Sequence, residues 1–241
     1  MKLFKKVLTG LFFAVLVLIL LVLIQSVDPT QEDLGYGVHQ FPDTLRQGSY
    51  NLDSLVEIVG TNKGLPAGYE EAALLAYSAY PELKDVRIDM VLTQEGAPME
   101  SNFDLVTLLG PSSGRVYKIL LNDADSSEFD EILLRSLPFN AQVGILAHEL
   151  GHVAYYHRMS TLEIAKWGFK YATDDTFRAT HEKTTDMMVI YHGMGSQIYQ
   201  YAWYVRNDPS TKPLYAQFGS LFIDKYYLTD QEIATIIQNR Q

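Results

Sequence analysis

The sequence predicts an α+β fold, because strand-like segments come first along the chain and helical segments follow them. Three segments between residues 86 and 123 have the alternation or the β-prone composition of strands. Beyond residue 129 the chain is a series of capped, amphipathic segments that are typical of helices. A small sheet that contains antiparallel pairing, followed by a helical half, is the expected architecture.

The strand predictions depend on local pattern. In residues 86–93, VRIDMVLT, apolar and polar positions largely alternate, as in a half-buried strand. Residues 103–110 and 115–123 are two β-prone runs separated by the turn sequence PSSG, which predicts an antiparallel hairpin. A helix is expected before these strands, from near Pro66 to a stop at Pro81.

The helical half shows several start and stop signals. Its expected helices cover residues 129–137, 141 to about 158, 174–193, 196–205 and 229–240. Asn140 is expected to cap the second of these helices, and Gly193 suits a left-handed stop to the third. Thr229 followed by Glu232 has the spacing of a capping box.

The N-terminal region is unlike the rest. Residues 7–24 are eighteen residues without a charge, which as a helix would rise about 27 Å, close to the roughly 30 Å core of a bilayer. A cleaved signal peptide usually has an apolar region of about 7–15 residues and an Ala-x-Ala site, which this segment lacks. We therefore expect residues 1–27 to be a retained single-pass anchor, with a cleaved signal as the alternative. Lysines before the segment and acidic residues after it place the domain outside the cytoplasm, on the periplasmic or extracellular side.

Composition narrows the remaining possibilities. Residues 28–64 are polar and are expected to be a linker or N-terminal extension, and residues 65–241 are expected to form the domain. The formal net charge of −10 argues against nucleic acid as a partner. The chain has no cysteine, which excludes disulfides, thiolate zinc sites and cysteine nucleophiles.

The most informative motif is His-Glu-Leu-Gly-His at residues 148–152. At about 100° per residue, His148 and His152 differ by about 40° and lie one turn apart on one helix face. Both imidazoles can therefore reach one cation at about 2.0–2.1 Å, and Glu149 can act as general base toward a water on the metal. Gly151 costs the helix about 1 kcal/mol relative to Ala and suggests that another segment passes close by. The alternatives are a degenerate site and two surface histidines.

A catalytic zinc ion needs a third protein ligand, and cysteine is absent. His157 lies about 140° from His152 around the helix, and His39 lies in the expected linker. The second long helix carries HEKTTD at residues 181–186. We assign Glu182 as the third ligand and Asp186 as the acceptor of the distal N–H of one histidine ligand. The alternative is an ordinary solvated helix face.

The run LAHELGHVAYYHRM, followed by a helix with Glu-x-x-x-Asp, resembles the gluzincin zinc metallopeptidases. The similarity is closest to the membrane-associated branch that includes CAAX-prenyl-protease-like and HtpX-like enzymes, and it covers roughly residues 115–205. His157 matches a further histidine of that branch, whereas Thr185 stands where the branch usually has Ala. The resemblance implies a zincin-like fold and an edge strand that pairs with substrate, which residues 115–122 would provide.

The expected function is thus that of a membrane-anchored metalloendopeptidase with one Zn²⁺ ion, acting on a peptide or protein substrate. A non-catalytic binding or scaffold domain of the same fold at the membrane is the alternative. The group that stabilises the oxyanion stays open among several side chains. The candidates are Tyr155, Tyr191, His192, Tyr199, Tyr201 and Tyr204.

Overall fold

The computed structural model describes residues 41–108 and 110–240. The expected anchor at residues 1–27 and the first part of the expected linker, including His39, lie outside the described residues. Within the described part, no helix is both long enough and apolar enough to cross a bilayer.

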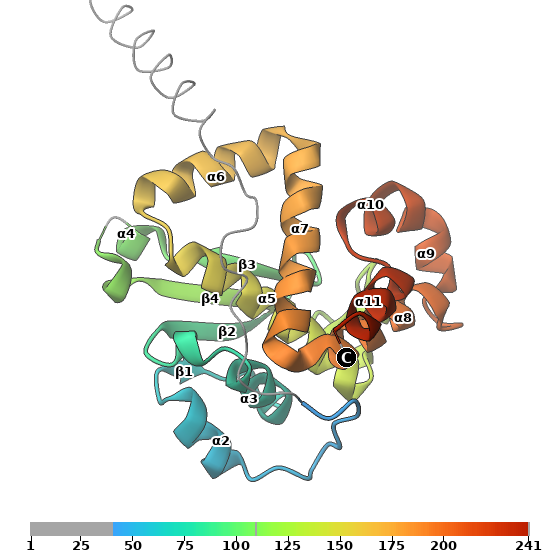
Figure 1. Ribbon diagram of the computed structural model, residues 1–241, viewed down its shortest axis with the longest axis horizontal. Coiled ribbons are helices and arrows are strands. Elements are labelled where there is room, and N and C mark those ends of the chain that lie inside the picture. Colours follow the sequence, from blue (N-terminus) through green and yellow to red (C-terminus); the bar gives the residue numbers. More distant parts are fainter. Residues whose placement is uncertain (1–40, 109, 241) are drawn as a thin grey trace, which may run out of the picture.

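The structure is α+β, with a four-stranded mixed sheet and a helical half (Figure 1). The strands are β1 (Lys63–Gly64), β2 (Arg87–Thr93), β3 (Met99–Phe103) and β4 (Val116–Asn122). Their order in the sheet is β1-β2-β4-β3, in which β3 alone runs antiparallel to its neighbour. Alternation buries Ile88 and Met90 of β2 beside Tyr117 and Ile119 of β4, so these strands contribute one face to the core.

The antiparallel pair forms, but the predicted first strand at residues 103–110 is wrong. The strand is β3, four residues earlier, and Leu105–Leu108 form the short helix α4. The Asp104 side chain accepts hydrogen bonds from the backbone N–H groups of Val106 and Thr107, which caps a helical turn instead of extending the strand. The expectation that residues 115–122 form an edge strand is also wrong, because β4 lies between β2 and β3. The edge is β3.

Helices make up most of the remaining chain. Those of the first half are α2 (Leu52–Val59), α3 (Glu70–Ser78) and α4. Those of the second half are α5 (Phe139–His157), α6 (Thr161–Thr173), α7 (Asp175–Val189), α8 (Gly195–Asn207), α9 (Lys212–Phe218), α10 (Asp224–Tyr226) and α11 (Asp230–Gln238). Two π-helical segments, Ile190–Met194 and Gly219–Ile223, join α7 to α8 and α9 to α10. Helix α6 was not expected from the sequence.

Several helix ends agree with the sequence and one does not. Gly193 adopts φ 87° between α7 and α8, and Thr229 forms the capping box with Glu232. Asn140 is not a cap, because α5 begins one residue before it, at Phe139. Its side chain instead accepts from Leu45 N at 2.7 Å and donates to Leu45 O at 3.0 Å. The expected helix at residues 129–137 is a pair of 3₁₀ turns, Asp130–Ile132 and Leu134–Ser136.

Part of the segment expected to be a linker belongs to the packed domain. Helix α2 places Leu55 and Val59 in the core, together with Leu45, and β1 pairs with β2. Since these residues pack on α3 and the sheet, the domain within the described residues already includes residues 45–64.

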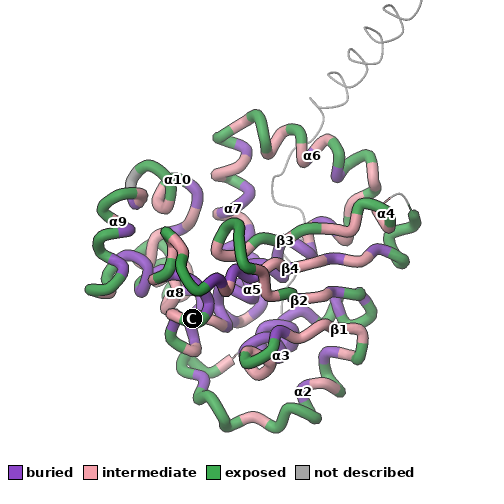
Figure 2. The backbone as a smooth tube through the Cα atoms, turned by 180° about the vertical axis from the view of Figure 1, so that it is seen from behind, coloured by how far each residue is buried: buried purple, intermediate pink, exposed green. Residues whose placement is uncertain are grey.

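Helix α5 runs through the centre of the molecule and is buried along most of its length (Figure 2). It contacts α3, α7, α8 and β3. Two glycines allow the closest approaches. A Cβ atom at Gly144 would lie 2.4 Å from the backbone oxygen of Gln197, and one at Gly151 would lie 2.9 Å from Cγ2 of Thr185. The close approach that Gly151 suggested is therefore made by α7.

Candidate metal centre

The structure brings together the three residues that the sequence assigned as metal ligands. His148 and His152 project from α5, and Glu182 projects from α7, which packs against it. Glu182 Oε2 lies 3.1 Å from His148 Nε2 and 3.3 Å from His152 Nε2. All three side chains are buried, and their ligand atoms lie within 4.8 Å of one another. This buried group could bind a metal ion.

The spacing and chemistry of the group fit a small tetrahedral cation. Ligands at about 2.0–2.1 Å on tetrahedral corners lie roughly 3.3 Å apart, and the two Glu182–imidazole distances are 3.1 and 3.3 Å. Two imidazoles and one carboxylate are ligand types that zinc takes at sites with an open coordination position. His157, which the sequence set aside, is directed elsewhere, with Nδ1 3.4 Å from the Tyr117 hydroxyl.

Asp186 orients the first histidine. Its Oδ1 atom accepts a hydrogen bond from His148 Nδ1 at 2.8 Å, while its Oδ2 atom accepts from the backbone N–H of Leu228 at 2.8 Å. The carboxylate is thus held from both sides. Because Nδ1 is engaged in this way, Nε2 is the nitrogen that faces Glu182, which is the orientation that binding of a metal ion through Nε2 would require.

The second histidine is oriented by two residues of α7 to which the sequence analysis gave no role. His152 Nδ1 lies 3.1 Å from His181 Nε2 and 3.3 Å from Thr185 Oγ1. Thr185 donates its own proton to the carbonyl of His181 at 3.0 Å, which leaves its oxygen free to accept. Thr185 therefore provides a hydrogen-bond partner for His152.

Burial and neighbouring charges set the protonation of the side chains at this site. Burial lowers the pKa of His181 to about 3, so the His181 ring is neutral and its Nε2 can accept a hydrogen bond. Burial opposes the charge on Glu182, yet the two histidines outweigh it and hold the Glu182 pKa well below its usual range. Burial also opposes a charge on His148, but the hydrogen bonds that its ring donates to the carboxylates of Asp186 and Glu182 raise its pKa well above 6.5.

Glu149, the expected general base, is fixed by the edge strand. Ser101 of β3 donates to Glu149 Oε2 at 2.6 Å and lies 2.8 Å from the Glu149 backbone oxygen. This contact ties α5 to the edge strand β3. The sequence could not reveal it, because residues 99–102 were not predicted to form a strand.

Two tyrosines at the site were absent from the six candidates for oxyanion stabilisation. Tyr171 of α6 donates to Glu182 Oε1, the carboxylate oxygen that does not face the histidines. The Tyr227 ring lies 5.7 Å from the His148 ring. Among the six, Tyr201 lines a cavity at the site, whereas Tyr204 donates to the Ser136 carbonyl and His192 pairs with Glu82.

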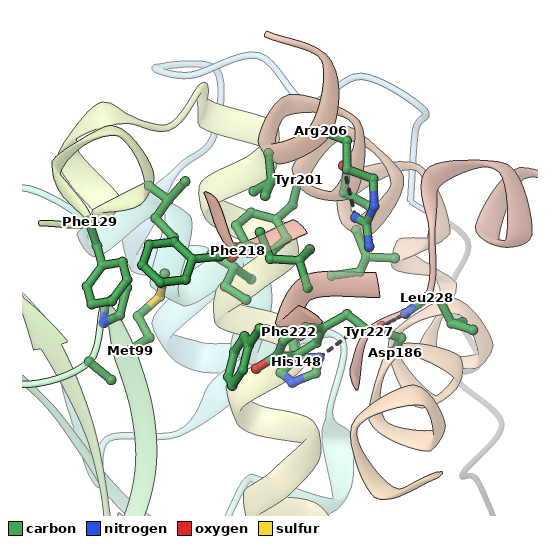
Figure 3. A pocket seen from close by; sticks show the side chains of 18 of the residues that line it. Met99, Phe129, His148, Asp186, Tyr201, Arg206, Phe218, Phe222, Tyr227 and Leu228 are labelled. Carbon is green, nitrogen blue, oxygen red and sulfur yellow. Dashed lines mark hydrogen bonds and ion pairs between the residues drawn. The ribbon is translucent and has the colours of Figure 1, made fainter. Parts of the chain in front are cut away.

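A cavity of about 380 Å³ opens beside the triad (Figure 3). His148, Glu149 and Asp186 are among the residues that line it. The other lining side chains are mainly apolar and come from the start of β3 and the residues before it, from α8 and α9, and from the segment before α11. A substrate bound at the triad would therefore extend into an apolar space.

Comparisons with protein-family models, with curated proteins and with solved structures find no match to this chain. The geometry of the site is thus the basis on which a function can be argued.

Proposed function

We propose that this chain is a zinc-dependent metallopeptidase that hydrolyses peptide bonds, held at the membrane by residues 1–27. The observation that carries the proposal is the convergence of His148, His152 and Glu182, with Glu149 and His148 among the residues that line the adjoining cavity. A structural zinc site would use four protein ligands, and this group offers three. The arrangement supports the resemblance to gluzincins and a zincin-like fold.

The roles of the chain's own residues follow from their positions. His148, His152 and Glu182 would hold the ion, with Asp186, His181 and Thr185 fixing the two imidazoles. When bound there, zinc supplies Lewis-acid polarisation of the peptide carbonyl and lowers the pKa of water.

Glu149 performs the proton transfers in this proposal. Its carboxylate takes a proton from the attacking water and passes it to the leaving amine, so that it ends the cycle in the state in which it began. Ser101, by donating to Oε2, holds the carboxylate in one rotamer during these transfers.

The replacement Glu149→Gln tests the mechanism. Zinc content should be unchanged, because Glu149 is not a ligand, while kcat for an unstructured peptide substrate should fall about 10³-fold. Mass spectrometry of a peptide digest and elemental analysis of the same preparation give both quantities. Equal hydrolysis by parent and variant would contradict the role of Glu149. If the parent protein binds zinc but hydrolyses no peptide, the result would support the non-catalytic binding domain instead.

The membrane part of the proposal has its own test. Extraction of membranes at alkaline pH should leave the full chain in the pellet, since residues 7–24 are long enough to span the bilayer. Release of a shortened chain would show that the segment is a cleaved signal.

A further inference from the structure

The cavity beside the triad is lined by a set of apolar side chains that is separate from the main core. Ile132, Val205 and Leu214 form their own buried cluster, with Phe129 and Phe218 packed at its edge. All five residues line the cavity. They come from a 3₁₀ turn, α8 and α9, so three distant segments leave an apolar space between them where a core would be filled.

Polar contacts join the helices that contribute to the wall of the cavity. Arg206 of α8 donates from Nε to Asp224 Oδ1 at 3.0 Å, and the Tyr215 hydroxyl donates to Asp224 Oδ2 at 2.7 Å. These contacts join α8, α9 and α10. The ion pair with Asp224 offsets the charge of Arg206, whose Nη2 atom is buried without a hydrogen-bond partner among the described residues.

The volume indicates the size of the occupant. A cavity of about 150 Å³ lined by Leu, Ile and Phe holds a benzene molecule, and this one is about 380 Å³. An alanine methyl group would leave nearly all of it empty. A charged side chain would lose its hydration among walls that are mainly apolar.

We infer that this cavity receives a large apolar side chain, aromatic or long aliphatic, that adjoins the scissile bond of the substrate. The inference rests on the proposed peptidase function, because His148 and Glu149 are among the residues that line the cavity and place its occupant next to the reacting carbonyl. The cavity then makes the chain selective for peptides with Phe, Trp, Leu or Met at that position, against Ala, Asp or Lys.

A peptide series tests the selectivity with the full-length, zinc-loaded protein. Quenched fluorescent peptides that differ in one residue, Phe, Ala or Asp, are compared at each position around the cleaved bond. At one position kcat/KM should be at least about 10-fold higher for Phe than for Ala, since apolar pockets discriminate by roughly this factor for even one missing methylene. Equal rates for the Phe, Ala and Asp peptides at every position would overturn the inference.

A matched pair of variants locates the selectivity. Ala202 of α8 lines the cavity and is buried, so Ala202→Leu should reduce the space and lower kcat/KM about 10-fold for the Phe peptide. The Ala peptide should change by less than about 2-fold, because it does not fill the cavity. Ala165→Leu, at an exposed position on α6, makes the same substitution away from the cavity and should change neither rate.

A binding measurement separates this inference from the proposed function. Saturation-transfer NMR should show N-acetyl-phenylalaninamide bound by the parent and by Ala165→Leu, more weakly by Ala202→Leu, and N-acetyl-alaninamide bound by none. If no peptide is hydrolysed but this pattern holds, the peptidase proposal fails and the apolar site stands. If the two amides bind alike, the inference is wrong even for an active enzyme. Should Ala202→Leu not fold, Phe218→Ala enlarges the same cavity and should raise the preference for Trp over Phe.

Discussion

Two adjacent regions of the molecule differ in how they are packed. One is the polar crossing of α5 and α7, and the other is the apolar cavity between α8, α9 and the 3₁₀ turns. At the crossing, imidazoles, carboxylates and hydroxyls are buried and bonded to one another, as His148–Asp186 and His152–His181 illustrate. In the cavity, apolar side chains face unfilled space. A metal centre needs ligands that cannot move, whereas a substrate pocket needs room. The two regions share His148 and Asp186, which bond to each other and also line the cavity.

At the α5–α7 crossing, the largest effect on zinc affinity should come from removing the residues that orient the two histidines. Asp186→Asn and His181→Ala should each weaken zinc binding about 10- to 100-fold, because partners of this kind fix the tautomer and position of a ligand. Competition with a chelator of known affinity measures the change. Phe218→Ala, a change confined to the apolar wall, is the control and should leave zinc affinity unaltered. If both variants bind zinc as tightly as the parent, Asp186 and His181 do not position the ligands.

Replacing one glycine in α5 and one in α6 tests how closely each helix is packed, through the change in the free energy of unfolding. Gly144→Ala should lower the free energy of unfolding by about 1–3 kcal/mol, since its Cβ would meet backbone atoms of Gln197 and Ile198 at 2.4–2.7 Å. Gly168→Ala on α6 meets nothing within 4 Å and should raise it by about 0.5–1 kcal/mol through helix propensity. Denaturation monitored by circular dichroism gives both values. Changes of the same sign would contradict the packing described for α5.

The smallest effect is expected at the contact between the sheet edge and the general base. Ser101→Ala should lower kcat several-fold and leave KM and zinc content unchanged, because one hydrogen bond of about 1 kcal/mol or somewhat more orients Glu149. Ser101→Thr keeps the hydroxyl and should restore most of the rate. If both variants lose activity equally, Ser101 acts through packing of β3 and not through its hydroxyl.

The sequence predicts those features that are governed by local rules. Helical periodicity relates His148 to His152, and four-residue spacing relates Glu182 to Asp186, so the residue spacing alone places each pair on one helix face. The capping box at Thr229 and the left-handed Gly193 are equally local. Contacts between distant segments are not encoded in such patterns.

Long-range contacts account for what the sequence missed. Asn140 looks like a cap, but its position next to Leu45 gives it a different role. Residues 105–108 look like a strand, yet the Asp104 cap turns them into a helix. The same holds at the site, where Tyr171 reaches Glu182 from a helix that was not expected, and where the cavity depends on three segments meeting.

The central claim is that His148, His152 and Glu182 hold one zinc ion, and zinc content tests it most directly. Elemental analysis of the purified full-length chain, loaded with zinc and freed of excess, should give about one ion per chain. His148→Ala should lose the ion, whereas His157→Ala should keep it, because His157 is directed toward Tyr117. A parent chain without bound zinc, or a His148→Ala variant that binds as much zinc as the parent, would contradict the account.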